Sequence, residues 1–191
     1  MDALEALLTR RSIGRLTEPA PSEQELRTML AAATAAPDHG RLRPWRFIVL
    51  RGAGLRALAD AFAQAQTVRE PEAAGATSGL VAATRAKLGR APVVVAVIAS
   101  PQPSAKVPAW EQQASAAAAA QNLCLAAHAL GYGAMWRTGW HGEAREVREH
   151  LGIAEEELLI AWVYVGSVPP DAAPPAARPP VELESVVEWR T

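Results

Sequence analysis

The segment APVVVAVIA, residues 91–99, is a continuous apolar run rich in β-branched side chains. A short run of this kind, without alternation of polar and apolar residues, is typical of a strand buried on both faces. The segments WRFIVL at 45–50 and LLIAWVYV at 158–165 also indicate strands, and residues 133–138 form a shorter one. We therefore expect a sheet with residues 91–99 in the core.

Segments with helical spacing of apolar residues lie between these strands. A capping box of Ser22 and Glu25 begins one of them, and Pro37 ends it. The predicted helices cover residues 1–10, the segment from Ser22 to Pro37, 55–65, 111–130 and 143–151. Residues 67–89 contain two glycines and mixed polarity, so they are expected to form a surface excursion with some helix.

Length and composition limit the classes of protein. The chain has 191 residues and no internal repeat, which predicts a single domain over residues 1–191. Nineteen Lys and Arg against twenty Asp and Glu give a net charge of -1, too balanced for binding nucleic acid through phosphate neutralisation. Cys124 is the single cysteine, and the N-terminus has no signal-peptide pattern, so a cytoplasmic location is expected.

The most apolar stretch, residues 114–135, is about long enough to span a bilayer, which takes about 20 residues. Its alanines are only weakly hydrophobic, however, and Gln121, Asn122 and His128 would have to lose their hydration in lipid. A buried helix of a soluble protein is therefore expected, with no membrane partner. Its run of small residues at 116–120 permits close packing against another helix.

The C-terminal segment, residues 168–191, differs from the rest of the chain. Prolines between 168 and 180 exclude regular structure, yet the chain then continues as VELESVVEW, whose apolar residues need a surface to cover. A stiff arm that lies on a neighbouring body meets this requirement.

Four polar segments are candidates for chemistry; one is the proline loop before the helix at 111–130, where Lys106 is the candidate and a purely structural helix start is the alternative. Arg10, Arg11 and Ser12 follow the first helix, and two guanidinium groups with a hydroxyl suit a phosphate. The alternative is that these arginines cap the helix or lie in water. The second candidate is the loop around His39, whose alternative role is a turn. The third is residues 131–139, GYGAMWRTG, in which glycines admit a planar ligand, or else only cap a helix and flank a core strand.

Other reactive residues carry no recognisable site. His128, His141 and His150 lack the spacing of metal ligands, so they are expected to be structural or surface residues and no metal is predicted. Cys124 lies within an apolar helix and is expected in the core. The nucleophile-elbow, Walker A and dinucleotide-binding glycine motifs are absent from the sequence.

Five segments together, in this order, resemble the nitroreductase family of FMN-dependent oxidoreductases, and most closely its small YdjA-type branch. They are MDALEALLTRRS, APDHG with RPWRF, KVPAWEQ, the small-residue helix leading into GYGAMWRTG, and LLIAWVYVGS. The resemblance covers nearly the whole chain. It implies an α+β fold in which helices flank a mostly antiparallel central sheet, and an intertwined homodimer with FMN at the subunit interface. The arm of residues 168–191 would then pack on the partner subunit.

The resemblance also implies cofactor contacts. Arg10, Arg11 and Ser12 would hold the phosphate end of FMN, and Trp136, Arg137 and Thr138 would close the site from the same subunit. The two arginine groups would therefore converge on one phosphate-bearing tail. His39, with the helix end at Ala35, would reach FMN from the other subunit.

Two positions depart from the family pattern. Relatives commonly carry a basic residue in place of Ala35 and a glutamine in place of Arg43, so flavin affinity or potential would differ here. The nicotinamide of the co-substrate would contact Ala126, Ala127, His128, Ala129, Leu130 and Gly131.

By this resemblance the protein uses NAD(P)H to reduce nitroaromatic, quinone or related small-molecule acceptors, in a ping-pong hydride transfer through flavin N5. The flavin carries the chemistry, so no side chain is assigned as catalytic. Two alternatives stay open. One is a non-catalytic FMN-binding or reservoir protein of the same fold. The other is a flavin-dependent enzyme that dehydrogenates another substrate or destroys the flavin.

Overall fold

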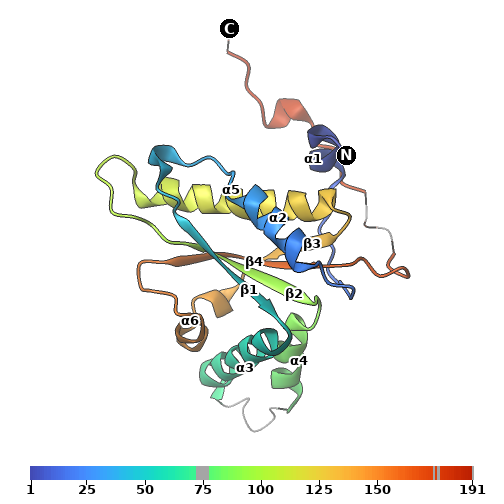
Figure 1. Cartoon of the computed structure of the whole chain (residues 1–191), viewed down its shortest axis with the longest axis vertical. Helices are drawn as coiled ribbons and strands as arrows, with labels where there is room; N and C mark the ends of the chain where they lie inside the picture. Colours follow the sequence, from blue (N-terminus) through green and yellow to red (C-terminus); the bar gives the residue numbers. More distant parts are fainter. Residues whose placement is uncertain (72–77, 174, 176, 191) are drawn as a thin grey trace.

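The structure, a computed structural model, describes residues 1–71, 78–173, 175 and 177–190. Within this part of the chain, four strands form one antiparallel sheet in the order β1-β2-β4-β3 (Figure 1). The strands are β1 (Trp45–Arg51), β2 (Val93–Ala99), β3 (Gly133–Arg137) and β4 (Leu158–Gly166). The sheet with helices around it confirms the predicted α+β fold.

Strand β2 is buried along its whole length because it has a neighbour on each side. Val95 pairs with Val49 of β1 and with Val163 of β4. Helices cover both faces of the sheet at β2, so no position in it faces water. This confirms the expectation drawn from its uninterrupted apolar sequence.

Two groups of helices cover the two faces of the sheet (Figure 1). Helices α2 (Glu23–Ala33) and α5 (Ala109–Ala129) pack on the face that includes Val93, Val95 and Val97. On the opposite face, α3 (Gly52–Arg69) and α6 (Arg145–Leu151) pack against Val94 and Ala96. Helix α4 (Ser78–Leu88) lies beside α3, and α1 (Ala3–Thr9) lies beside α5. We call these the α5 face and the α3 face.

Small residues bring α5 close to the sheet. Ala116, Ala119, Ala120 and Ala127 are fully buried, and the Asn122 amide donates to the Ala32 carbonyl at 3.2 Å, which ties α5 to α2. The predicted close packing of this helix against another is therefore confirmed. The helix ends at Ala129, and Gly131 follows its cap with a φ of 86°, in the left-handed region that favours glycine.

Helix α3 is longer than the sequence predicted. It begins at Gly52 and continues to Arg69, beyond the expected end at residue 65. Gln66 is buried, and the Thr67 hydroxyl bonds back to the Ala63 carbonyl at 3.0 Å, so polar residues continue the helix instead of ending it. The predicted excursion at 67–89 therefore contains the end of α3 and all of α4, and its residues 72–77 lie outside the described part.

Among the described residues, every helix is too short or too polar to cross a bilayer. This includes α5, for which the sequence predicted a buried helix outside the membrane.

A buried ion pair joins β1 to the loop before β4. The guanidinium of Arg46 donates to both carboxylate oxygens of Glu157 at 2.7 Å, and to the Gly152 carbonyl at 2.7 Å. The Arg46 hydrogen bonds lower the pKa of Glu157 from 4.5 to about 2, although burial opposes the shift. The Glu157 side chain is 8% exposed and the Arg46 side chain 33% exposed.

This pair predicts a pH dependence of folding stability. A carboxyl whose pKa is lower in the folded state stabilises the fold above its unfolded pKa of 4.5, and this contribution is lost as pH falls from 4.5 towards 2. Glu157→Gln should lower the free energy of unfolding at pH 7 by about 1–2 kcal/mol, and the variant should lose less stability than the wild type between pH 7 and pH 3. Denaturant titrations at the two pH values measure this difference. Glu149→Gln, which breaks an exposed pair with Arg145, is the control and should change little; equal losses for both variants would contradict the prediction.

Candidate functional site

The segment after α1 lies against the edge of the sheet at β3. Ser12 forms a bridge with Ala134, and the Ile13 amide donates to the Ala134 carbonyl at 3.1 Å. Further along, a guanidinium nitrogen of Arg137 donates to the Gly14 carbonyl at 3.4 Å. Two of the predicted motifs, Arg10–Ser12 and Trp136–Thr138, are therefore adjacent in space although far apart in sequence.

The side chains of the second motif point to different faces of the sheet. Trp136 packs on the α5 face, whereas the guanidinium of Arg137 lies 5.3 Å from the ring centre of Tyr164 on the α3 face. Successive residues of a strand alternate between faces, and this explains the difference. Arg10 is on the α5 side, where its charge opposes the burial that raises the pKa of Cys124 to about 11. Arg10 and Arg137 therefore approach the edge of the sheet from different sides, and the expected convergence of the two arginine groups on one tail stays a prediction.

The arginines after α1 differ in what they already bind. Arg11 donates to the carbonyls of Leu8 and Arg10 at 2.9 and 3.0 Å, so it caps α1 as the structural alternative predicted. Arg10 and Arg15 form no ion pair with any described carboxylate. The Nε atom of Arg137 is buried without a hydrogen-bond partner in the described structure. These cations suit a negatively charged or hydrogen-bond-accepting group.

The predicted contacts at Ala35 and His39 lie near the other end of α5. Ala35 follows the end of α2 and is exposed, and His39 Nδ1 lies 2.8 Å from Glu111 Oε2 in the first turn of α5. Beside them is a pocket of about 270 Å³ that His39 lines together with Trp110 and Ser115.

The length of α5 separates this region from the arginines after α1. At the C-terminal end of α5, Thr9 Oγ1 lies 2.8 Å from His128 Nε2, next to Arg10. His128 is 17 positions after Glu111, and a rise of 1.5 Å per residue places the two ends about 25 Å apart. His39 and Arg10 of one chain therefore do not reach the same small ligand. A ligand that contacts both needs two copies of the chain.

The predicted nicotinamide segment covers the last turn of α5 and its cap. Ala127 is buried, Ala126 and His128 are half-buried, and Ala129, Leu130 and Gly131 are exposed. Only the end of this segment is accessible in the single chain.

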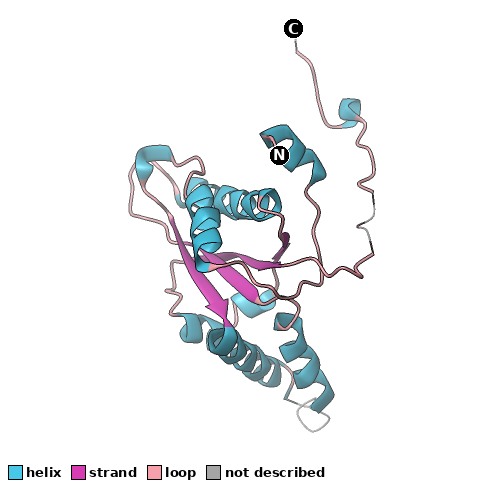
Figure 2. Cartoon of the chain, turned by 45° about the vertical axis from the view of Figure 1, so that its right-hand side comes forward, coloured by secondary structure: helices cyan, strands magenta, loops and turns pink. Residues whose placement is uncertain are grey.

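Two terminal segments leave apolar side chains uncovered. Leu4 and Leu8 of α1 are 71% and 68% exposed, and Val186 and Trp189 near the C-terminus are 67% and 84% exposed. Figure 2 shows α1 and the C-terminal segment standing away from the body of the chain. Arg178 donates to the Arg10 carbonyl at 3.0 Å, so the arm passes the candidate site before it leaves the body. Such exposure is unusual for an isolated monomer and indicates a partner surface.

Sequence reasoning did not anticipate a group of aromatic and cationic residues around the buried His141, beside Arg137. His141 stacks between Phe62 at 4.3 Å and Trp140 at 4.0 Å, and Arg69 lies 4.4 Å from the ring centre of Trp140. Burial, followed by the charges of Lys87 and Arg69, lowers the pKa of His141 to about 4, which keeps it neutral near pH 7. These residues are far apart in sequence, so no local motif could reveal them.

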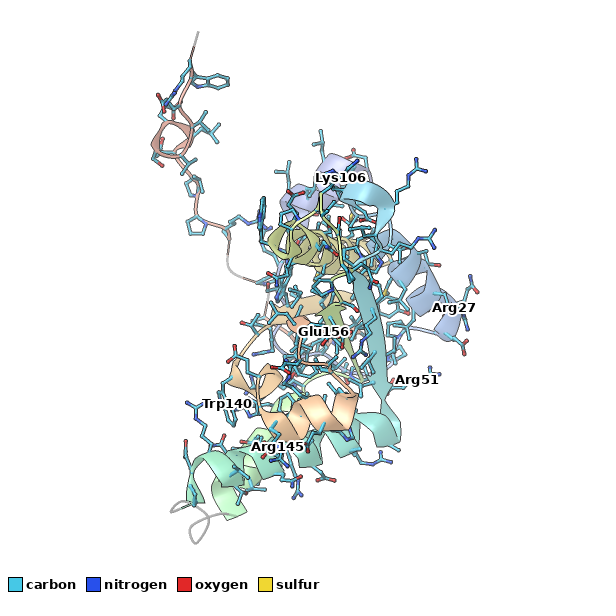
Figure 3. The ribbon with its side chains drawn as sticks, turned by 90° about the vertical axis from the view of Figure 1, so that its left-hand side faces the viewer. Arg27, Arg51, Lys106, Trp140, Arg145 and Glu156 are labelled. Atoms are coloured by element: carbon cyan, nitrogen blue, oxygen red, sulfur yellow. The ribbon has the colours of Figure 1, made fainter. Side chains whose placement is uncertain are left out.

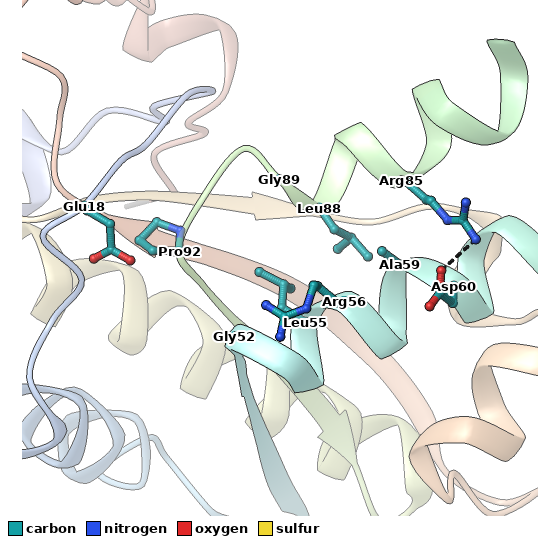
Figure 4. A pocket seen from close by; sticks show the side chains of 10 residues that line it. All are labelled: Glu18, Gly52, Leu55, Arg56, Ala59, Asp60, Arg85, Leu88, Gly89 and Pro92. Carbon is teal, nitrogen blue, oxygen red and sulfur yellow. Dashed lines mark ion pairs between the residues drawn. The ribbon is translucent and has the colours of Figure 1, made fainter. Parts of the chain in front are cut away.

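A further pocket of about 490 Å³ lies between α3 and α4 (Figure 4). Leu55 and Leu88 form part of its apolar lining, and an ion pair between Arg85 and Asp60, 2.8 Å apart, lies at one end. None of the residues predicted to bind the cofactor lines it.

Comparison with known proteins places these features in a family. A sequence model described as "Nitroreductase family" matches residues 7–167. The chain is 38% identical to the protein named "Putative NAD(P)H nitroreductase YdjA" of Escherichia coli K12, over 87% of this chain and 88% of that protein. It is 39% identical to "Putative NAD(P)H nitroreductase" of Haemophilus influenzae, over 87% of this chain and 89% of that one.

Solved structures share the fold. A nitroreductase-like family protein from Bacillus cereus superposes with a TM-score of 0.83 at 24% identity, covering 100% of this chain and 96% of that one. The FMN- and NADPH-dependent nitroreductase NfnB from "sphigopyxis sp. strain HMH" superposes with a TM-score of 0.76 at 22% identity, covering 100% of both chains. At these identities the likeness concerns the fold alone.

The exposed apolar segments predict that the chain self-associates through its C-terminal arm. Deletion of residues 169–191 should weaken self-association by about tenfold or more, because apolar residues between Val181 and Trp189 would no longer be covered by a second copy. Sedimentation over a concentration series measures the change. Arg190→Ala, which removes only an exposed pair with Glu188, should behave as the wild type. An unchanged association constant after deletion would show that the arm has no role in assembly.

Proposed function

The chain belongs to the nitroreductase family, and on that premise we propose that it is an FMN-dependent oxidoreductase. It would use NAD(P)H to reduce nitroaromatic, quinone or related acceptors. The names of the E. coli and H. influenzae relatives support NAD(P)H as the electron donor. The FMN and NADPH dependence of NfnB, a protein of the same fold, supports the cofactor.

The observation that carries the proposal is the contact between Ser12 and Ala134. It brings the Arg10–Ser12 segment, which ends α1, to the strand that carries Trp136, Arg137 and Thr138. Among the described residues, Arg10 has no acidic partner and the Nε of Arg137 has no hydrogen-bond partner, and both lie along one stretch of the sheet edge. This donor set fits a flavin mononucleotide, which has an anionic phosphate at one end and hydrogen-bond acceptors on its ring.

We assign the phosphate end to Arg10, Arg11 and Ser12, and Trp136, Arg137 and Thr138 would close the site from the same subunit. Because Arg137 lies on the α3 face and Arg10 on the α5 side, the two arginines would approach the cofactor from different sides of the sheet edge. Arg11 already caps α1, so its contribution to the phosphate would be smaller than that of Arg10.

Ala35 and His39 would complete the site from the partner subunit of a homodimer. The distance of about 25 Å between the ends of α5 supports this division, because it prevents one chain from supplying both halves. Arg43 belongs to the same loop as His39, and its backbone amide donates to Asp38 Oδ2 at 2.8 Å. Its exposed guanidinium would bring a positive charge from the partner.

FMN, when bound, would supply hydride exchange through its N5 atom, first with NAD(P)H and then with the acceptor, in a ping-pong cycle. The residues of this chain would bind and orient the cofactor and would not act as nucleophiles. A positive charge from Arg15 or Arg43 near the ring would favour its anionic reduced form. The exposed end of the segment from Ala126 to Gly131 would contact the nicotinamide.

The first test is reduction of the bound cofactor. Protein loaded with FMN should lose its visible flavin absorbance when mixed without oxygen with NADPH or NADH, and should recover it when a quinone or nitroaromatic is added. Stopped-flow absorbance measures both steps. Protein that retains FMN as a dimer but is bleached by neither nucleotide would be a flavin-binding protein without turnover, and the proposed activity would fall.

The second test addresses the phosphate contact. Arg10→Ala should weaken FMN retention by about tenfold or more, since a charge-assisted hydrogen bond is worth roughly 1.5–3 kcal/mol. Fluorescence titration with FMN measures the affinity. Arg27→Ala is the matched control, because Arg27 is exposed and pairs with Glu23 on α2; its affinity should equal that of the wild type.

Mixed dimers extend the second test to the division of the site between subunits. A dimer of one Arg10→Ala chain and one His39→Ala chain contains one intact site and one doubly altered site. It should bind about one FMN with wild-type affinity, whereas each parent homodimer has two weakened sites. Two equally weakened sites in the mixed dimer would show that one chain supplies both residues.

A further inference from the structure

We propose that the pocket behind β3, between Arg137, Lys87 and the stack of His141, binds the oxygen-bearing edge of a planar anion. The pocket has a volume of about 250 Å³ and lies on the α3 face of the sheet. It is separate from the region of Arg10, which lies on the α5 side. One arm of the test below rests on the proposed flavin function, and the others do not.

The charge of the pocket selects an anion. Two cations line it, Arg137 from β3 and Lys87 from α4, and its lining contains no carboxylate. Neither cation forms an ion pair within the described structure. Lys87 lies close enough to lower the pKa of His141, so its charge acts inside the pocket. Because uncompensated cations raise the local concentration of anions, this region favours a negative ligand.

Unpaired polar atoms gather at the same place. Four buried side-chain atoms lack a hydrogen-bond partner among the described residues, and three of them belong to residues that line this pocket: Arg137 Nε, His141 Nε2 and Trp162 Nε1. Two are N–H donors, and the neutral imidazole nitrogen either donates or accepts. Buried polar groups are nearly always paired in folded proteins, so a cluster of unpaired donors indicates a ligand or bound water.

The three atoms are covered by neighbouring side chains, and a ligand reaches them only when a side chain shifts. Lys87 and Thr138 are exposed and are accessible without such movement. We therefore infer that a ligand meets Lys87 and Thr138 first. A shift of the Arg137 guanidinium, which holds the Gly14 carbonyl only at a long 3.4 Å, then opens the inner donors.

The shape of the pocket and the rings that line it favour a flat ligand group. The rings of Trp140, Trp162 and Tyr164 line the pocket, and Phe62 lies behind His141. A volume of about 250 Å³ leaves room for one ring with a carboxylate. Two sources have a flat ring with oxygen atoms at one edge. One is a separate aromatic carboxylate, and the other is the oxygen-bearing edge of the flavin ring.

The experiment uses benzoate as the probe and benzamide as its neutral isostere. Titration calorimetry on the full-length protein without flavin should show saturable binding of benzoate, at least tenfold tighter than that of benzamide. Lys87→Met should weaken benzoate binding about tenfold. Lys106→Met is the matched control, because Lys106 is the other lysine of the chain and lies far from Trp140 (Figure 3); it should bind benzoate as the wild type does.

Two further measurements distinguish the two possible ligands, and they separate failure of this proposal from failure of the proposed function. Benzoate that binds equally to protein with and without FMN identifies a separate carboxylate site. Benzoate displaced by FMN, together with weaker FMN binding in Lys87→Met, identifies the flavin ring edge. The proposal is overturned when benzoate and benzamide bind alike, or when Lys87→Met matches Lys106→Met for both benzoate and FMN. If the protein still binds FMN and reduces it normally in that case, the proposed function stands.

Discussion

The contact between α5 and the central sheet is the constraint on which the rest of the molecule depends. Fully buried alanines let the helix backbone lie close to β2 and β4, and the helix then runs straight across the α5 face for 21 residues. Its two ends each hold one predicted half of the cofactor site. A rigid helix of this length keeps the halves apart within one chain, so assembly becomes a condition for a complete site.

The same constraint gives the terminal segments a function. Helix α1 has one buried residue, Ala6, and presents Leu4 and Leu8 to water. The C-terminal arm likewise presents Val186 and Trp189. Burial of these side chains by a second copy would occur on the side of the molecule where Arg10 lies, since Arg178 of the arm contacts the Arg10 carbonyl. The apolar area that favours association is therefore adjacent to the residues proposed to bind the phosphate, and dimer formation and cofactor binding would stabilise each other.

Much of the fold follows from the sequence, because local patterns specify it. The uninterrupted apolar run at 91–99 requires a neighbour on both sides, and β2 has them. As predicted, a capping box of Ser22 and Glu25 begins α2, and Gly131 follows the C-terminal end of α5. The predicted end of α3 was wrong because Gln66 and Thr67 look like loop residues. In the structure Gln66 is buried and the Thr67 hydroxyl donates to the Ala63 carbonyl, so the helix continues through both. The contact of Ser12 with Ala134 has no local signal, and only the family resemblance linked the two motifs.

The orientation of Arg137 shows where sequence reasoning stops. The sequence suggests that the two arginine groups bind one phosphate. A strand sends Trp136 and Arg137 to opposite faces, however, and the motif does not state which face the ligand occupies. The net charge of -1 was equally uninformative about local fields. Carboxylates pair with Arg27, Arg46 and Arg145, while Arg10, Lys87 and Arg137 remain without acidic partners in the described structure. A nearly neutral chain can therefore contain regions that favour anions, because recognition depends on which charges are left uncompensated and not on their sum.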